Sequence, residues 1–208
     1  LTLVRNDNWY GAAPAFDRLE FRAIENTGAM ASNLLAGQID YILGELGLPL
    51  DQALGFEKRL PAGAFTVTYK QGLTYEHIDL PLDRPPFNDV RLRRALMLAL
   101  DRDAINRHLF DGRQPPAASN INPLDTVFTD KVTAYPHDPA QAGQLLDDAG
   151  WRLGSDGLRR NDKGEVLRLT LATTAGNISR ELVQQVIQSD WRKIGIDADF
   201  TPDRKSTR

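Results

Sequence analysis

Residues 167–200, LRLTLATTAGNISRELVQQVIQSDWRKIGIDADF, decide the fold class of this chain. LRLTLATT forms the second arm of a predicted hairpin whose turn lies at residues 161–164. An amphipathic helix that ends at Gly195 follows, and IDADF predicts a further strand. The apolar side chains of the helix share one face: Leu182, Val186, Ile187 and Trp191. The order strand, helix, strand predicts an α/β protein.

The same order of elements is predicted near the start of the chain. AFDRLEFRAI alternates apolar and charged side chains, which predicts a strand over roughly 18–24. Asn26 or Thr27 caps a following helix that ends at Gly37. The short buried strand predicted after this helix contains Ile39, Tyr41 and Ile42. Such a unit is consistent with a parallel crossover.

The middle of the chain contains a predicted boundary between two domains. One short helix is predicted near 51–58, within a segment rich in Gly and Pro. AFTVTYK (64–70) and YEHIDL (75–80) are both strand-like, and QGLT lies between them. We place the domain boundary near residues 64–72.

Two helices are predicted in PPFNDVRLRRALMLALDRDAINRHLF. Asn88 or Asp89 caps the first helix, with acidic charge at its positive end, and Asp101 or Asp103 starts the second. The first helix has an apolar stripe formed by Val90, Ala95, Leu96, Ala99 and Leu100. Its outward face carries Arg91, Arg93 and Arg94.

A further helix follows a long, proline-rich segment at residues 113–137. A loop of this length is usually functional or lies along a surface. DPAQAGQLLDDAGW then predicts a short helix, with Asp138 as its N-cap, Pro139 at its first position and Gly150 closing it.

The composition is that of a globular protein, with 41% hydrophobic and 25% charged residues among 208. The net charge of −3 shows no excess of basic residues, so nucleic acid is not an expected partner. The absence of cysteine excludes disulfides, thiolate catalysis and cysteine zinc sites. No apolar run reaches the about 18 residues that a bilayer span needs. The chain starts without Met and ends just after a predicted strand, so we expect both ends to lie inside a longer protein.

The segment YEHIDL gathers side chains that could carry chemistry. Tyr75, His77 and Asp79 share one face of the predicted strand, because side chains alternate along a strand. A His and an Asp on one face can ligate a metal or form an orienting pair. The other histidines, His108 and His137, lie far along the sequence. We favour a structural strand; the wall of a ligand cleft and a metal or catalytic site are the alternatives.

The segment TTAGN (173–177) joins a predicted strand to the N-terminus of a helix. Such a junction is either an ordinary capping loop or a place where backbone N–H groups receive anionic or carbonyl groups. It is not a P-loop, because no Gly-Lys-Ser/Thr follows it. The chain contains no Gly-x-Ser-x-Gly or Gly-x-Gly-x-x-Gly motif. The residues alone therefore indicate an α/β binding domain, or part of one, without catalytic apparatus.

Four stretches match motifs of one known family in the same order. RNDNWYGAAPAFDRLEFRAIENTGAMASNLLAGQIDYI is similar to Asn-x-x-Tyr/Trp-Trp/Tyr-Gly-x-x-Pro, a strand, and a helix ending in Gly-Glu/Gln-Ile-Asp. YEHIDLPLDRPPFNDVRLRRALMLALDRDAI is similar to Pro-Phe-x-Asp-x-Arg-Val-Arg-x-Ala followed by Ala-x-Asp-Arg. YPHDPAQAGQLLDDAGW matches Tyr-x-x-Asp-Pro-x-x-Ala-x-x-Leu-Leu-x-x-Ala-Gly-Trp, and residues 167–200 match a strand, loop and helix with Lys-x-x-Gly-Ile. The chain thus resembles the family 5 extracellular solute-binding proteins, the periplasmic peptide, oligopeptide, nickel or opine receptors of ABC importers.

The resemblance implies an α/β, periplasmic-binding-protein-like (type II) architecture, in which two lobes close on a ligand. Residues 1–65 would be the C-terminal part of the lobe I segment, and residues 66–208 would be most of lobe II, truncated before the return to lobe I. YEHIDL would lie just past the hinge crossing, where its charges would not catalyse. The implied ligand-binding residues are Gly72, Leu73, Thr74, Thr173, Thr174, Asn177 and Ser179.

The resemblance also implies a function without catalysis, metal or cofactor. The protein would capture short peptides or related solutes and deliver them to ABC transporter permease subunits in the inner membrane. It would be periplasmic, or extracellular as a membrane-anchored lipoprotein. An aspartate that holds the ligand's α-amine in peptide-binding members would lie beyond Arg208. The alternatives are a regulatory or signalling domain of the same fold, and a hydrolase or metal-dependent domain that uses His77 and Asp79.

Overall fold

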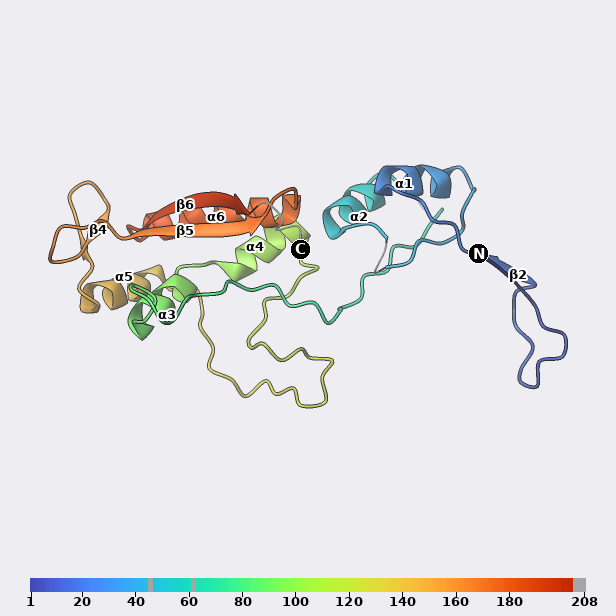
Figure 1. The fold of residues 1–208 in the computed structure, drawn as a ribbon, viewed down its shortest axis with the longest axis horizontal. Coiled ribbons are helices and arrows are strands. Elements are labelled where there is room, and N and C mark those ends of the chain that lie inside the picture. Colours follow the sequence, from blue (N-terminus) through green and yellow to red (C-terminus); the bar gives the residue numbers. More distant parts are fainter. Residues whose placement is uncertain (45–46, 61–62, 204–208) are drawn as a thin grey trace. The chain divides into compact units, whose positions relative to one another are not determined.

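The computed structural model describes residues 1–44, 47–60 and 63–203, with side chains up to residue 201 (Figure 1). The chain divides into two compact units, Leu1–Thr66 and Val67–Arg208. The assignment of these units to two lobes stays a prediction.

The first unit contains a small hairpin and two short helices. Strands β1 (Thr2–Val4) and β2 (Arg18–Glu20) pair in antiparallel register, and every residue in both strands is exposed. Helices α1 (Thr27–Leu35) and α2 (Leu50–Glu57) follow. Asn26, rather than Thr27, caps α1, because its side-chain Oδ1 accepts a hydrogen bond from the Ala29 N–H at 2.7 Å.

The predicted parallel crossover in the first unit is wrong. Strand β2 is shorter than the predicted 18–24, and its partner is the antiparallel β1. No strand includes Ile39, Tyr41 or Ile42 among the described residues, and Tyr41 is 75% exposed. The apolar side chains of this segment therefore lack the neighbouring strand and the burial that would stabilise a sheet.

Four helices of the second unit begin at side-chain caps. These helices are α3 (Val90–Leu98), α4 (Arg102–Phe110), α5 (Pro139–Asp148) and α6 (Ile178–Lys193). Their caps are Asp89, Asp101, Asp138 and Asn177, each of which accepts a backbone N–H from the first turn. An N-cap oxygen satisfies a donor that has no partner within the helix. Asp89 rather than Asn88 therefore caps α3, and Asp101 rather than Asp103 caps α4.

Strands β5 (Arg168–Thr174) and β6 (Asp197–Asp203) form a parallel pair, and α6 connects them (Figure 1). This is the strand, helix, strand order that the sequence predicts, so the α/β class is confirmed. Strands β3 (Arg152–Leu153) and β4 (Arg159–Arg160) form an antiparallel pair beside it. The predicted turn at residues 161–164 is also confirmed, since the Gly164 N–H donates to the Asn161 carbonyl at 2.9 Å.

The two strands predicted at residues 64–70 and 75–80 are absent from the described part of the chain. Neither segment joins a ladder of backbone hydrogen bonds, so their alternating side chains do not produce a strand. Strand propensity reflects packing against cross-strand neighbours, and these segments have none here.

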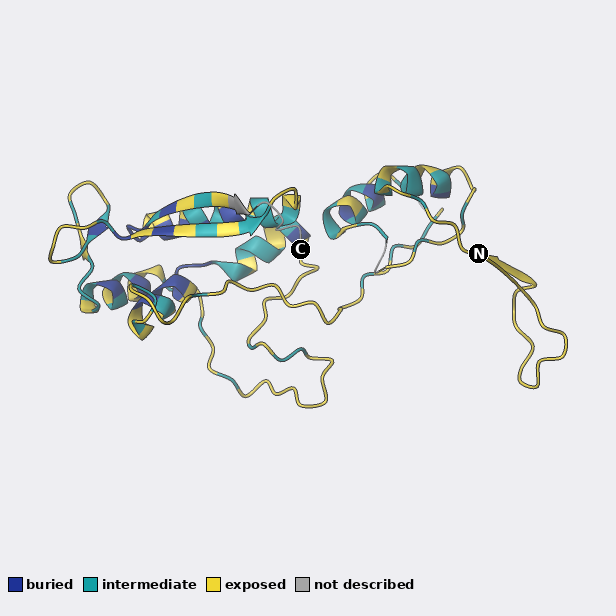
Figure 2. Ribbon diagram, in the orientation of Figure 1, coloured by how far each residue is buried: buried dark blue, intermediate teal, exposed yellow. Residues whose placement is uncertain are grey.

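A single hydrophobic core lies between the helices and the parallel pair of the second unit (Figure 2). It includes Leu96 and Leu98 of α3, Leu146 of α5, and Ile187 and Trp191 of α6. The Trp191 indole N–H donates to the Leu96 carbonyl at 3.1 Å, which satisfies the polar atom of this buried ring.

The predicted apolar faces of α3 and α6 are correct only in part. Of the α3 stripe, Val90 is 44% exposed, whereas the other four predicted residues are buried. Arg93 is half-buried and donates to the Phe87 carbonyl at 2.7 Å, so it does not face outward as predicted. On α6, Leu182 is exposed and Val186 is half-buried. The predicted segments contain the helices, but the neighbouring elements decide which part of each apolar face is covered.

Candidate functional site

The loop after β5 lies at the carboxyl end of a strand and at the N-terminus of a helix. Residues 175–177 turn directly from β5 into α6, and Gly176 adopts a φ of +80° there. A positive φ favours glycine, because it has no Cβ to clash with the backbone. In open α/β sheets, ligands bind beyond the carboxyl ends of the strands. The topology therefore makes this loop the first candidate for a ligand-binding site.

The capping interpretation of this loop is confirmed. The Asn177 side-chain Oδ1 accepts a hydrogen bond from the Arg180 N–H at 3.0 Å. The Glu181 carboxylate accepts the Gly176 N–H at 2.9 Å, across the start of the same helix. An acidic side chain in the first turn also complements the helix dipole. The loop is therefore held in one conformation by its own side chains.

Arg180 joins this loop to the segment that precedes α3. Its Nη1 donates to the Thr174 hydroxyl at 2.9 Å. Its Nε and Nη2 donate to the two carboxylate oxygens of Glu76, at 3.1 Å and 2.8 Å. Hydrogen bonding to Glu76, together with the carboxylate's charge, raises the pKa of Arg180 above its ordinary value. The Arg180 guanidinium thus joins the end of β5 to Glu76, which lies 104 residues before Arg180 in the sequence.

The long loop at residues 113–137 lies against the same segment. The Asn122 amide donates to the Gly72 carbonyl at 2.9 Å. The Arg113 guanidinium lies over the Tyr69 ring, 4.3 Å from its centroid. These two contacts join the loop to residues 69 and 72. That the loop is functional or lies along a surface stays a prediction.

The seven predicted ligand-binding residues fall into two groups in the second unit. Gly72, Leu73 and Thr74 are all exposed. In the other group, Thr173, Thr174 and Ser179 are half-buried, and Asn177 is exposed. Within the described residues, no hydrogen bond joins the two groups directly.

The connection between the two groups runs through Glu76 and Arg180, which the sequence analysis did not single out as site residues. Glu76 lies two residues after Thr74, and Arg180 lies one residue after Ser179. No local spacing rule joins an acid to an arginine this far apart. The one sequence feature that could have pointed to Arg180 is its position in the first turn of the helix that follows a strand-end loop.

The side chains of Tyr75, His77 and Asp79 contact one another in sequence, although the strand that was predicted to align them does not form. The rings of Tyr75 and His77 stack with centroids 4.8 Å apart, and His77 Nε2 lies 3.3 Å from Asp79 Oδ1. The Asp79 side chain is 96% exposed. In the part of the chain that the structure describes, no group of three or more His, Cys, Asp or Glu side chains could hold a metal ion.

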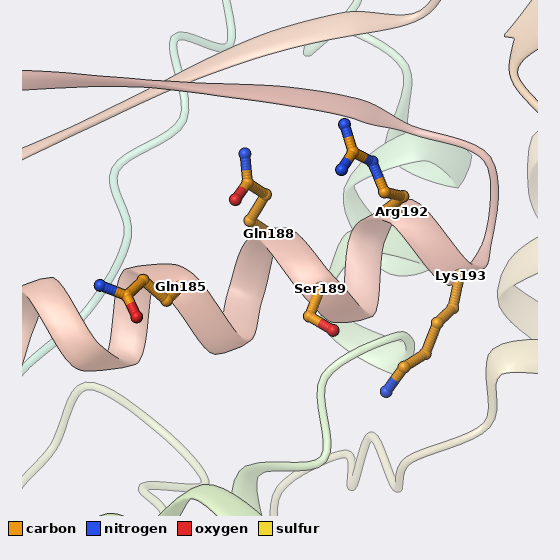
Figure 3. A pocket seen from close by; sticks show the side chains of 5 residues that line it. All are labelled: Gln185, Gln188, Ser189, Arg192 and Lys193. Atoms are coloured by element: carbon orange, nitrogen blue, oxygen red, sulfur yellow. The ribbon is translucent and has the colours of Figure 1, made fainter.

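Two shallow depressions lie elsewhere. One, of about 340 Å³, lies on the outer face of α6 (Figure 3). Its lining is polar and consists of Gln185, Gln188, Ser189, Arg192 and Lys193. The other, of about 290 Å³, lies in the first unit and includes Trp9 and Phe16. Neither depression contains a predicted ligand-binding residue.

No helix within the described ranges is both long enough and apolar enough to cross a membrane.

Known proteins similar to this chain bind solutes. The chain is 27% identical over 205 residues to the nickel-binding periplasmic protein of Escherichia coli, covering 98% of this chain and 38% of that protein. It is 28% identical over 200 residues to the oligopeptide-binding protein AppA of Bacillus subtilis, covering 95% of this chain and 35% of AppA. The chain therefore spans little more than a third of the length of these relatives.

A solved structure shows the same fold. The crystal structure of NikA from Brucella suis in complex with Fe(III)-EDTA matches 99% of this chain and 41% of NikA, with a TM-score of 0.75 and 25% identity. The α/β, periplasmic-binding-protein-like (type II) fold class is thereby confirmed, with part of the two-lobe architecture present. The family described as bacterial extracellular solute-binding proteins, family 5 Middle, matches residues 1–208. The chain therefore belongs to family 5 of the bacterial extracellular solute-binding proteins.

Proposed function

We propose that the protein is the substrate-binding component of an ABC importer. It captures short peptides or related solutes between two lobes and delivers them to permease subunits in the inner membrane. The observation that carries the proposal is the family match over residues 1–208, which extends across both compact units. Relatives named for nickel and oligopeptide binding support a receptor, and none of those cited is named as an enzyme.

In this proposal the two units belong to different lobes. Residues 1–65 are part of lobe I, and residues 66–208 are most of lobe II. The support is that the chain divides at Thr66 into separate compact units. Closure of two lobes excludes water from a ligand and couples occupancy to docking. The proposed location is the periplasm, or the cell exterior with a lipid anchor.

The proposed ligand wall lies in the second unit, at the carboxyl end of β5. Residues 72–74 provide backbone groups in an exposed segment that contains a glycine. Residues 173–179 provide small polar side chains around the start of α6. Such groups hydrogen-bond the backbone of a peptide without selecting its side chains. The wall consists of Gly72, Leu73, Thr74, Thr173, Thr174, Asn177 and Ser179.

Native mass spectrometry of the gently purified full-length protein tests the proposal. A ladder of co-purified masses that fits short peptides is the expected result. A single non-peptide mass retains the receptor and changes the ligand class. The proposal is overturned if the protein carries no small molecule and also binds none of a panel of alanine tri-, tetra- and pentapeptides, glutathione, Ni²⁺–histidine and haem.

A matched pair of variants tests the site. Thr174→Val removes a hydroxyl from the proposed wall and retains its shape, and Thr170→Val makes the same change on the exposed side of the same strand. We expect Thr174→Val to weaken binding of the identified solute by about threefold to tenfold, the cost of one hydrogen bond. Thr170→Val leaves the dissociation constant unchanged. Equal effects of the two substitutions would remove Thr174 from the site.

A further inference from the structure

One guanidinium in the second unit makes hydrogen bonds to two distant segments at once. Arg180 is bidentate to Glu76, through Nε and Nη2, and its Nη1 reaches the last residue of β5, Thr174. Arginine is suited to this task because its five donors lie in a rigid planar fork. Lysine cannot reproduce the arrangement, since its ammonium is a point charge on a flexible chain.

The ion pair by itself contributes little to global stability. The side chains of Arg180 and Glu76 are 41% and 56% exposed, and ion pairs this exposed to solvent add little to the free energy of unfolding. Its consequence is local: the pair holds the exposed segment at residues 72–79, which joins no strand ladder in the described chain. The hydrogen bond from the Asn122 amide to the Gly72 carbonyl is a second tie between this segment and the rest of the unit.

The bond to Thr174 has a second consequence. A hydroxyl has one hydrogen to donate and two lone pairs to accept. Because Thr174 Oγ1 accepts from Arg180, its own hydrogen is directed to a different partner. Among residues 63–201, whose side chains the structure describes, no acceptor takes that hydrogen. The hydroxyl is therefore poised to donate to an acceptor oxygen outside this network.

We propose that Arg180 is the positioning residue of the ligand wall. It holds residues 72–79 against the carboxyl end of β5 through Glu76, and it orients the Thr174 hydroxyl to donate to an acceptor oxygen of the ligand. This inference rests on the proposed function for its ligand, whereas the positioning of residues 72–79 is a property of the ligand-free protein.

Backbone ¹⁵N relaxation of the ligand-free, full-length protein tests the positioning role, because it reports the motion of amides whether or not they make hydrogen bonds. Arg180→Ala and Glu76→Ala each lower the order parameters of residues 72–79 from about 0.85 to below about 0.6. The control is Arg168→Ala, which removes a guanidinium pair with Asp197 at the opposite end of β5. The control leaves the order parameters of residues 72–79 unchanged. Equal order parameters in Arg180→Ala and wild type would overturn the proposal.

Two further variants separate pairing from the orientation of Thr174. Arg180→Lys retains a charge that reaches Glu76 and loses the fork. The double variant Glu76→Arg with Arg180→Glu restores an ion pair of reversed polarity and removes the donor to Thr174. We expect both variants to keep the order parameters of residues 72–79 at the wild-type level. All variants should melt within about 2 °C of wild type, because the pair is exposed.

Binding of an equimolar mixture of alanine tri-, tetra- and pentapeptides, measured by native mass spectrometry, provides the second readout. Arg180→Ala weakens binding about tenfold, and Arg180→Lys and the reversed pair remain weakened about threefold to fivefold although their order parameters are normal. Full binding by the reversed pair would show that Thr174 is not oriented by Arg180. If wild type binds none of the peptides, peptide binding is wrong, and the relaxation result alone decides whether Arg180 positions the segment.

Discussion

The two units of the molecule bury their apolar side chains to very different extents. In the second unit, a continuous cluster from α3, α5, α6 and both strands of the parallel pair is buried, and Leu92, Ala142, Leu146 and Ile196 have no measurable exposure. In the first unit, the buried hydrophobic residues are Leu34, Leu54 and Phe56 among those described. The first unit also exposes many large apolar side chains, among them Leu1, Val4, Trp9, Tyr10, Phe16 and Tyr41.

The strands differ in the same way. The β5–β6 pair is parallel, and a long amphipathic helix returns between the strands and covers one face. The β1–β2 pair is a short antiparallel hairpin with both strands exposed, and an isolated two-stranded hairpin is marginally stable in water. A side chain should therefore matter most where it is enclosed by the core of the second unit, and the same substitution should matter less in the first.

The largest effect is expected from cavities. Leu146→Ala removes a fully buried side chain from α5 and should lower the free energy of unfolding by about 3–5 kcal/mol. Leu34→Ala in α1 should cost about 1–2 kcal/mol, because its surroundings are open to solvent and can collapse around it. Urea unfolding followed by circular dichroism measures both. Equal costs would show that the first unit encloses Leu34 as tightly as the second encloses Leu146.

Arg159 is the next largest contributor, and it lies in the second unit. Its side chain is 5% exposed and donates to the Ile194 carbonyl at 2.7 Å, the Asp147 carboxylate at 2.7 Å and the Trp151 carbonyl at 2.6 Å. It therefore joins the ends of α5 and α6. Arg159→Ala leaves these acceptors without their donor and should lower stability by about 2–3 kcal/mol.

The neighbouring Arg160 provides the control for that experiment. It pairs with Asp156 at 2.9 Å on the surface of the same strand. Arg160→Ala should change the unfolding free energy by less than about 0.5 kcal/mol. If the two substitutions had similar effects in urea, Arg159 would not be the buried link between the helices.

Helix caps give a smaller effect that again separates the units. Asp138→Ala removes the N-cap of α5, whose Oδ1 accepts the Gln141 N–H at 2.8 Å, and should lower the global unfolding free energy by about 1 kcal/mol. Asn26→Ala should fray α1 without changing the unfolding of the second unit. Amide exchange resolved by peptide distinguishes the two results. Slower or unchanged exchange in α1 after Asn26→Ala would contradict the assigned cap.

The smallest effect is a dependence on pH. The hydrogen bond from the Arg91 side chain lowers the pKa of Asp89, and partial burial raises it by less. The pKa of Asp89 therefore lies below its ordinary value of 3.8. A carboxyl group whose pKa is lowered by folding stabilises the fold above its unfolded pKa and loses that contribution as pH falls through the folded pKa. Stability should therefore decrease as pH falls below 3.8.

Asp89→Asn isolates this contribution, since Asn caps helices as well as Asp and does not titrate in that range. The variant should show a shallower loss of stability in acid than wild type, measured by urea unfolding at a series of pH values. A loss of the same steepness would assign the acid sensitivity to other carboxyl groups.

The sequence predicted the elements whose signals are local. The cap Asp138, the turn at 161–164 and the helix before Gly195 were identified correctly, and Asn26 was one of two candidate caps, because a capping oxygen or a glycine after the last turn acts within a few residues. The strands at 64–70 and 75–80 were wrong, because a strand also requires a partner that periodicity cannot reveal. The buried role of Arg159 was missed for the same reason, since its acceptors lie on three separate segments.

The candidate site also has one part that local sequence signals predict and one part that depends on distant contacts. The loop at residues 173–177 was identifiable, because a strand end beside a helix start is a local pattern. The groups that connect it to residues 72–74, Glu76 and Arg180, were not identifiable, because their pairing depends on the path of the chain between them. The family resemblance supplied the two proposed ligand segments, and the geometry supplied the connection between them.

Hydrogen–deuterium exchange of the full-length protein, with and without the solute that native mass spectrometry identifies, tests the central claim most directly. We predict that added solute slows exchange in peptides covering residues 72–74 and 173–179, and leaves the hairpin at 152–166 unchanged. Protection confined to other regions, such as the outer face of α6 at residues 185–193, would contradict the proposed ligand wall.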